Sequence, residues 1–399
     1  MSPAPANQTA PSARTVASIA GISAADWDRL ANPAPAITNP FVTHAFLQAL
    51  EDAGTVGGRT GWTPRHMVLE RDGGIAGVAP AYVKSHSQGE YIFDHGWAEA
   101  YQRAGGNYYP KLQIAVPFTP VPGPRFLVGA GAHAAQNRAY LAQGTIELAR
   151  QMGVSSVHAT YTDQATWEAL GGGTQPLFLQ RTDQQFHWQN AGYASFDDFL
   201  AALSSRKRKT IRKERQTAVE AGLGIKLLRG PEITEAYWDA FYKFYQDTGN
   251  RKWGRPYLNR KFFSLLGERM GGSCLLIVAE RQGRPIAGAL NLIGGDCLYG
   301  RYWGMTEHHP CLHFELCYYQ AIDWAIAHKL PRVEAGAQGE HKLARGYVPV
   351  TTHSLHWIAD TGFRKAVDRY LGEERAHMAE RREMLAEYAP YRKVVEEQD

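Results

Sequence analysis

The sequence has few cysteines and lacks a long apolar run. Only four cysteines occur among 399 residues, and none belongs to a C-x-x-C pair, which excludes a disulfide framework. No stretch approaches the roughly 18 consecutive apolar residues of a spanning helix. Residues 1–21 contain one base and no apolar segment typical of a signal peptide. We therefore expect a cytoplasmic protein with reduced thiols and a flexible N-terminal tail.

Acidic and basic residues nearly balance, but the bases are unevenly placed. Apolar residues make up 44% and charged residues 21% of the chain, which excludes a wholly disordered, collagen-like or coiled-coil protein. Residues 205–215 (SRKRKTIRKER) contain seven bases and one acid, whereas the net charge of the chain is only +4. A polyanionic partner is therefore expected to meet this segment rather than a broad basic face.

The order of predicted elements indicates two domains. In each half, a hairpin and a further strand lead to a long helix, predicted at residues 132–152 and 312–328, and then to a short strand. We divide the chain into a flexible tail (1–22), an N-terminal domain (23–191), a linker with the basic helix (192–222) and a C-terminal domain (223–399) that ends in a long helix.

The two predicted hairpins are similar in sequence. Residues 69–77 read LERDGGIAG, and residues 279–288 read AERQGRPIAG. E-R-x-G is common turn chemistry, so two unrelated hairpins are one interpretation. We favour duplication of one domain, because the order of elements agrees as well as the letters.

A mixed sheet in which a helix follows a meander, twice over, resembles the GNAT acyltransferase fold. The strings at residues 93–125 (FDHGWAEAYQRAGGNYYPKLQIAVPFTPVPGPR), 196–215 and 333–349 (VEAGAQGEHKLARGYVP) resemble the FemAB-like family of bacterial N-acyltransferases. The resemblance extends over about residues 40–390. It implies an α/β protein with two tandem GNAT-like domains, each a mixed, mostly antiparallel sheet flanked by helices. Fem-type ligases transfer an aminoacyl group from tRNA to a peptidoglycan precursor, but this sequence shows no long helical arm, so the donor stays open.

An acyl donor that carries phosphate needs an anion site, and helix N-termini provide one. Gly129 and Gly131 precede the helix predicted at 132–152, and Arg125 stands just before them. We assign these three residues to donor binding, with an ordinary helix-start loop as the alternative. Residues 304–312 offer a poorer phosphate cradle in the second half. The first domain is thus expected to hold phosphate, although the opposite division stays open.

Catalysis is predicted in the loop of residues 336–349. Glu340 or His341 is the expected proton acceptor, Lys342 and Arg345 would stabilise charge, and Gln338 would contact substrate. The position is similar to the F-K-x-G-F-G turn of Fem-type ligases, where Lys and backbone line the transfer site. A solvated polar loop is the alternative.

Other polar residues are candidates for substrate binding. One group, in the first half, offers an acid, a base and aromatic rings: Asp94, His95, Trp97 and Tyr101. A second group, in the other half, is Tyr299, Arg301 and Glu315, in which the first two share a strand face and Glu315 is expected to pair with Arg301. Packing and a structural ion pair are the alternatives.

The cluster of His308, His309, Cys311, His313 and Cys317 lacks the spacing of a dedicated zinc site, so no metal is predicted. Arg208 and Arg212 of the basic helix are expected to contact an anionic partner, including tRNA.

Together these features predict an N-acyltransferase in which an amine attacks the donor carbonyl directly. Acyl-CoA is the favoured co-substrate and aminoacyl-tRNA the second, with no tightly bound cofactor. A non-catalytic protein that recognises a cell-wall or nucleotide ligand is the rival of another class. We expect a monomer or homodimer.

Overall fold

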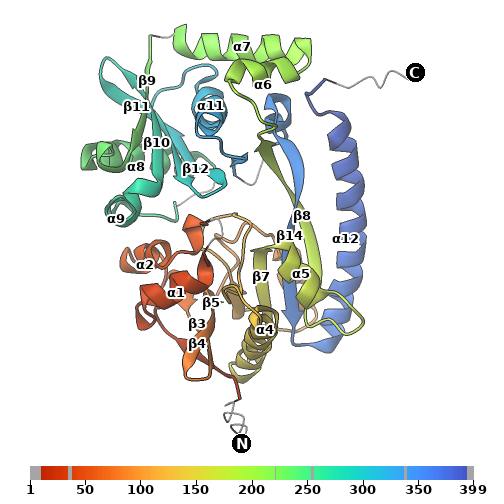
Figure 1. The fold of residues 1–399 in the computed structure, drawn as a ribbon. Helices are drawn as coiled ribbons and strands as arrows, with labels where there is room; N and C mark the ends of the chain where they lie inside the picture. Colours follow the sequence, from red (N-terminus) through yellow and green to blue (C-terminus); the bar gives the residue numbers. More distant parts are fainter. Residues whose placement is uncertain (1–9, 35–37, 221, 253–255, 337–338, 393–399) are drawn as a thin grey trace, which may run out of the picture. The chain divides into compact units, whose positions relative to one another are not determined.

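The chain forms two compact units that alternate along the sequence (Figure 1). This computed structural model describes residues 10–34, 38–220, 222–252, 256–336 and 339–392. Unit 1 comprises Met1–Asp183 and Thr352–Met378, and unit 2 comprises Gln184–Thr351 and Ala379–Asp399. The predicted boundaries at 192–222 therefore need correction. Two strands, β8 (Leu179–Gln189) and β14 (Val348–Ile358), each run from one unit into the other, so each unit is built from two stretches of chain.

Unit 1 contains two groups of strands. A small sheet has the order β1-β3-β4 (Ser12–Val16, His66–Arg71, Gly74–Ala79). The other strands follow the order β2-β5-β6-β7-β14, with β2 at Trp62–Pro64, β5 at Ala81–Lys84, β6 at Lys111–Ile114 and β7 at Ser156–Thr162. The apolar side chains of α4 (Ala134–Gln151), among them Leu141 and Ile146, pack with strand residues such as Val157 in one core.

Three of the other helices of unit 1 begin at a polar N-cap residue. Ser23, Thr43 and Asp163 each accept a hydrogen bond from a backbone N–H of the first helical turn. The helices are α1 (Ala24–Ala31), α2 (His44–Asp52), α3 (His95–Arg103), α5 (Gln164–Gly171) and the first part of α12 (Thr361–Glu387), with 3₁₀ turns at Ile19–Gly21 and Pro40–Val42. The long terminal helix expected from the sequence is confirmed as α12, whereas sequence patterns did not identify α3 or α5.

Unit 2 has the strand order β8-β13-β12-β11-β10-β9. Its strands are β9 (Gly224–Arg229), β10 (Cys274–Arg281), β11 (Arg284–Ile293), β12 (Cys297–Met305) and β13 (Arg332–Glu334). Its helices include α6 (Phe196–Ala202), α7 (Ser205–Glu220), α8 (Glu235–Lys252), α9 (Arg260–Met270) and α11 (Gln320–Ala327). The predicted meander β10–β11–β12 is confirmed, and the predicted α/β class with helices flanking mixed sheets is confirmed in both units.

The hairpins β3–β4 and β10–β11 are built alike. Each closes through two residues with positive φ, Asp72 (51°) with Gly73 (77°) and Gln282 (52°) with Gly283 (74°), the geometry of a twisted two-residue hairpin turn. In each hairpin the pairing register also shifts close to the turn, between Leu69 and Glu70 in the first and between Ala279 and Glu280 in the second. Shared turn and bulge positions support a duplicated origin, although β3–β4 lies in a separate small sheet.

Each unit also contains one strand pair that is parallel and joined by a helical crossover. In unit 1, β6 and β7 are parallel and α4 connects them; in unit 2, β12 and β13 are parallel and the segment of residues 312–327 connects them. Both pairings are short, with three registered residue pairs each. The two strands of each pair therefore separate after three residue pairs. The candidate site lies at the separation of β12 and β13 in unit 2.

Candidate active site

The strands β12 and β13 separate in the middle of β12. They pair from Cys297 with Arg332 to Tyr299 with Glu334, after which β13 ends and β12 continues to Met305. The partner strand β11 shows a register shift at the same level, since Leu290 lies opposite Tyr302 whereas Asn291 lies opposite Gly300. Arg301 is therefore an extra residue, and such a bulge bends a strand and redirects its side chains.

A pocket of about 260 Å³ lies at this separation. It is bounded by strands on one side and by a helix start and a loop on the other. Its lining residues are Thr248, Ala289, Leu290, Asn291, Gly300, Arg301, Tyr302, Trp303, His313, Cys317, Tyr318, Ala335, Gly336, His341 and Lys342. All belong to unit 2.

The helix predicted at residues 312–328 is not uniform. A short α10 (Leu312–Phe314) is followed by a π-turn, η5 (Glu315–Tyr319), and then by α11. π-Turns are rare and frequently occur at functional sites. Here the π-turn carries Cys317 and Tyr318, which line the pocket. The His313 ring packs against Trp303 at 5.1 Å and Tyr318 at 5.3 Å between centroids, which ties the helix start to β12.

The predicted catalytic loop contributes two adjacent residues to the pocket. His341 and Lys342 stand in the 3₁₀ helix η6 (Glu340–Arg345). Nε2 of His341 lies 2.8 Å from the Tyr318 hydroxyl oxygen, and Lys342 Nζ donates a 2.7 Å hydrogen bond to the carbonyl of Gly336. Burial, reinforced by the charge of Arg301, lowers the pKa of Lys342 to about 7. A lysine of this kind changes its charge near neutral pH.

Two other predicted catalytic residues do not line the pocket. The Glu340 side chain is 57% exposed and pairs with Arg381, so its placement argues against the proton-acceptor role considered from sequence. Arg345 is buried and pairs with Glu214 of α7 at 2.7 Å, and it donates to the backbone carbonyl of His341. Arg345 thus braces the loop instead of facing substrate. Gln338 lies outside the described residues.

The predicted pair between Arg301 and Glu315 is wrong. Arg301 pairs with Glu334 at 2.9 Å, and its guanidinium lies 5.6 Å from the Tyr299 ring centroid, so the expected proximity of Tyr299 and Arg301 is confirmed. Glu315 instead accepts hydrogen bonds from Arg215 of α7, the shortest at 3.0 Å. Tyr299 is 2% exposed, and burial raises its pKa.

The basic helix α7 has two distinct sides. Glu214 and Arg215 face the body of unit 2 through Arg345, Glu315 and Asp323. On the solvent side, Arg212 is exposed and pairs with Asp197, an exposed residue as well, and Arg208 is half-buried. Part of the helix charge is therefore neutralised internally, while the remaining bases stay available to an anion.

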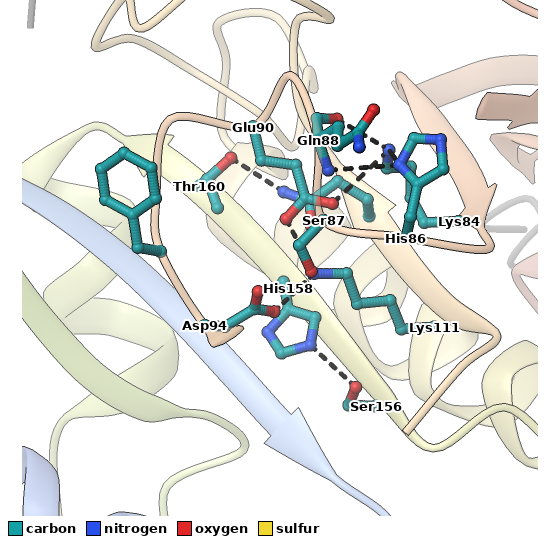
Figure 2. A network of polar contacts seen from close by, with 12 residues as sticks. Lys84, His86, Ser87, Gln88, Glu90, Asp94, Lys111, Ser156, His158 and Thr160 are labelled. Atoms are coloured by element: carbon teal, nitrogen blue, oxygen red, sulfur yellow. Dashed lines mark hydrogen bonds and ion pairs between the residues drawn. The ribbon is translucent and has the colours of Figure 1, made fainter. Parts of the chain in front are cut away.

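In unit 1, the predicted acceptor residues separate into a buried network and a packed cluster. Asp94 is 3% exposed and, together with Glu90, pairs with the buried ammonium of Lys111 (Figure 2). Burial favours a higher pKa for Asp94, but the charge and hydrogen bond of Lys111, together with the other polar contacts of the network, lower this pKa below its usual value. The Tyr108 hydroxyl donates a 2.6 Å hydrogen bond to the same carboxylate. Asp94 is therefore committed to a structural network.

The aromatic members of that predicted group are mostly packed. Trp97 lies edge-on to His356 at 4.9 Å between ring centroids, and Tyr101 stacks on Phe363 at 4.5 Å. Of the four residues predicted in this group, only His95, at the start of α3, is exposed. The packed-loop alternative fits Trp97 and Tyr101 better than an acceptor pocket does.

Arg125 is hydrogen-bonded where the strands β6 and β7 of unit 1 separate. The parallel pairing of β6 and β7 ends at Ile114 and Ala159, and Arg125 Nε donates a 2.8 Å hydrogen bond to the carbonyl of the next residue, Thr160. Its other nitrogens donate to the carbonyls of Val121, Gly123 and Pro124. With 1% exposure and four carbonyl partners, this guanidinium has little surface to offer a phosphate, so its placement argues against the donor-binding role predicted for it.

Gly129 and Gly131 do precede α4, with φ of 66° and 131°, a region that favours glycine. A Cβ at Gly129 would lie 3.4 Å from Leu30, whereas none of the described atoms lies within 4 Å of the Gly131 position. Their assignment to donor binding stays a prediction.

Sequence reasoning missed several pocket residues. Asn291 stands in a segment that the sequence pattern identified only as a strand, Thr248 lies in the C-terminal part of α8, and no sequence signal marks either residue. Cys317 and Tyr318 were seen as part of a regular helix, since a π-turn has no clear sequence signature.

Within the described part of the chain, no group of three or more His, Cys, Asp and Glu side chains is arranged to hold a metal ion. None of the helices in these same ranges is both long and apolar enough to cross a membrane.

Comparison with known proteins identifies the fold and the family. Residues 18–393 match the sequence model of a family described as FemAB-like, peptidoglycan biosynthesis/recognition. The crystal structure of FemX is similar with a TM-score of 0.51 at 13% identity, covering 87% of this chain and 98% of FemX. A conserved protein of unknown function from Bacteroides thetaiotaomicron has a TM-score of 0.51 at 11% identity, covering 85% and 98%. No curated protein is significantly similar. The two structures indicate a shared fold, and the predicted family resemblance and tandem GNAT-like fold are confirmed.

Proposed function

Because the chain belongs to the FemAB-like family, we propose that it is an N-acyltransferase whose reaction takes place in the unit 2 pocket. The observation that carries this proposal is the open separation of β12 and β13 with Lys342 beside it. An extended acyl donor can add its backbone-like portion to the free strand edges there. Acyl-CoA is the donor we propose, and aminoacyl-tRNA is the alternative.

The amine acceptor must be neutral before it can attack the donor carbonyl. A general base works best when its pKa lies near the operating pH, and the pKa of Lys342 is about 7. We assign Lys342 the role of proton acceptor in its neutral form. In the reaction a C–N bond forms, the acceptor proton passes to Lys342 Nζ, and the C–S bond to CoA or the C–O bond to tRNA breaks.

Negative charge on the carbonyl oxygen needs a hydrogen-bond donor. Burial raises the pKa of Tyr318, so its hydroxyl stays protonated over the physiological range. Tyr318 contacts His341 at 2.8 Å and both line the pocket. We assign the Tyr318–His341 pair to stabilising the carbonyl oxygen, which replaces the roles that sequence reasoning gave to Glu340 and Arg345.

Two observations bear on the aminoacyl-tRNA alternative. The family description names peptidoglycan biosynthesis, and tRNA would provide phosphates for the exposed bases of α7. The same description includes recognition, so a ligand-binding protein without turnover is the rival of another class.

The test is turnover with defined donors. The purified protein is incubated with acetyl-CoA or alanyl-tRNA and a peptidoglycan precursor that carries a free amine, and the product is identified by mass spectrometry. Lys342→Met should lower turnover about 10²–10⁴-fold, whereas Lys243→Met, an exposed lysine on α8, should leave it unchanged. The turnover of the wild type should rise with pH through about 7, and Lys342→Met should lose this limb.

Binding of a donor without turnover of either donor would favour the recognition protein. Turnover that Lys342→Met does not lower would remove Lys342 from catalysis and return the question of the base to His341.

A further inference from the structure

Asn291 is a buried polar residue in the wall of the pocket. It stands on β11 opposite Gly300, next to the bulge at Arg301, and is 1% exposed. Its amide nitrogen donates to the carbonyls of Ala289 (3.2 Å) and Leu275 (3.4 Å). Because both of these neighbours are acceptors, the orientation of the amide group is defined. Among the residues that the structure describes, no group is a hydrogen-bond partner of its Oδ1.

The space beside this oxygen is preserved by glycine. A Cβ added at Gly300 would lie 3.1 Å from Asn291 Oδ1, which is closer than side-chain carbon atoms usually approach. Gly300 also lines the pocket. A side chain at this position would therefore crowd the very oxygen that lacks a partner.

A buried acceptor without a partner is costly, and native proteins rarely retain one without a reason. We propose that Asn291 Oδ1 is a specificity-determining acceptor that binds an N–H group of the acyl donor at the separation of β12 and β13. The inference rests on the proposed function in one respect, that this pocket receives the donor. It adds the chemistry that the donor must present there, a nitrogen-bound hydrogen a short distance from the transferred carbonyl.

Two donors offer this chemistry. The pantetheine arm of acyl-CoA contains amide N–H groups, and an aminoacyl ester has an α-ammonium group beside its carbonyl. A plain acyl ester has neither. The proposal therefore predicts discrimination between ligands that differ only in this N–H, and the residue responsible for it.

The test combines ligand pairs with protein variants. One pair is S-acetyl-pantetheine and its analogue in which the amide N–H nearest the thioester is replaced by an ester oxygen. The other pair is alanyl-adenosine and propionyl-adenosine, which lacks the α-amino group. Affinities are measured by titration calorimetry without acceptor, for the wild type, Asn291→Leu and Gly300→Ala. Gly300→Ala keeps Asn291 but crowds its oxygen, so it serves if Asn291→Leu folds poorly.

The expected result is that the wild type prefers the N–H ligand of one pair by about tenfold, or up to about a hundredfold for the charged ammonium. Both variants should reduce that preference to less than about threefold. The pair that shows the effect identifies the source of the N–H group. Lys342→Met, with Asn291 intact, should keep the preference even though it loses turnover.

Equal affinities within both pairs, or a preference that both variants retain, would overturn the inference and indicate that water occupies the position. Failure of all four ligands to bind at millimolar concentration would overturn it as well. Absence of turnover of either donor by the wild type, together with a preference that depends on Asn291, would instead refute the proposed function and leave this inference standing.

Discussion

Replacing Lys342 with methionine should stabilise unit 2 at neutral pH while it removes activity. Lys342 is 1% exposed, and burial lowers its pKa to about 7, against about 10.4 in an unfolded chain. Between these values the unfolded state binds more protons than the native state. The stability of the wild type therefore rises with pH over this window, and below about pH 7 the destabilisation by the buried lysine is complete.

The magnitude follows from the difference between the two pKa values. At about 1.4 kcal/mol per pKa unit, the buried lysine destabilises the native state by roughly 4–5 kcal/mol at pH 7. The substitution also removes one hydrogen bond, from Lys342 Nζ to the carbonyl of Gly336, which contributes about 1 kcal/mol. We expect Lys342→Met to raise the free energy of unfolding by about 2–4 kcal/mol at pH 7. This gain should shrink by roughly 3 kcal/mol toward pH 9.5.

The assay is urea unfolding of the wild type, Lys342→Met and Lys243→Met between pH 6.5 and 9.5. Lys243 lies on α8 and is exposed, so its substitution should change stability by no more than about 0.5 kcal/mol at any pH. A gain for Lys342→Met that does not depend on pH would indicate better packing alone. No gain at pH 7 would refute the reasoning, because a lysine that destabilises the fold by several kcal/mol must release that free energy on removal.

Three further predictions concern residues whose roles the structure revises. Glu214→Gln removes the carboxylate that pairs with Arg345, so we expect kcat to fall about tenfold with KM little changed. Glu214→Asp should restore part of the lost kcat. If the fraction of folded protein falls as much as kcat does, Glu214 has a structural role only. Charge reversal at the exposed Arg212 should shift Tm little, since an exposed charge contributes under about 1 kcal/mol, and reversal at Arg212 and the half-buried Arg208 together should weaken tRNA binding most at low salt; unfolding of the Arg212 variant would contradict it. Arg125→Met should destabilise unit 1 by about 3 kcal/mol or more with donor affinity unchanged in the folded fraction, whereas a selective loss of donor affinity would restore its predicted phosphate role.

Local sequence chemistry predicted the elements that are governed by local interactions. The E-R-x-G turn identified both hairpins, because residues that tolerate positive φ at the turn determine a two-residue connection. The long terminal helix, α12, was also predicted from the sequence. The division into units was not, because it depends on β8 and β14 crossing from one unit to the other, which is a property of long-range pairing.

The difference between local and long-range interactions also explains why the sequence predicted the site only in part. The sequence located the loop after β13 but could not say which of its side chains turns into the pocket. That outcome depends on partners far along the chain, such as Glu214 for Arg345 and Arg381 for Glu340. The bulge at Arg301, which brings Asn291 and Gly300 together, is a matter of strand register and has no sequence signature.

The two halves use the same architectural position in opposite ways. In unit 1, the strands separate after Ile114 and Ala159, and the buried Arg125 joins the carbonyl of Thr160 to the preceding loop. In unit 2, the equivalent separation follows Tyr299 and Glu334 and is a pocket. The Arg125 guanidinium already donates to four carbonyls, one of them that of Thr160 on β7, so it is engaged within the protein at this position. Under the proposed function the division of labour is the reverse of the one favoured from sequence, with the donor in unit 2. Because residues 304–312 there contain a single glycine, the strand edges and Asn291 would then provide the recognition.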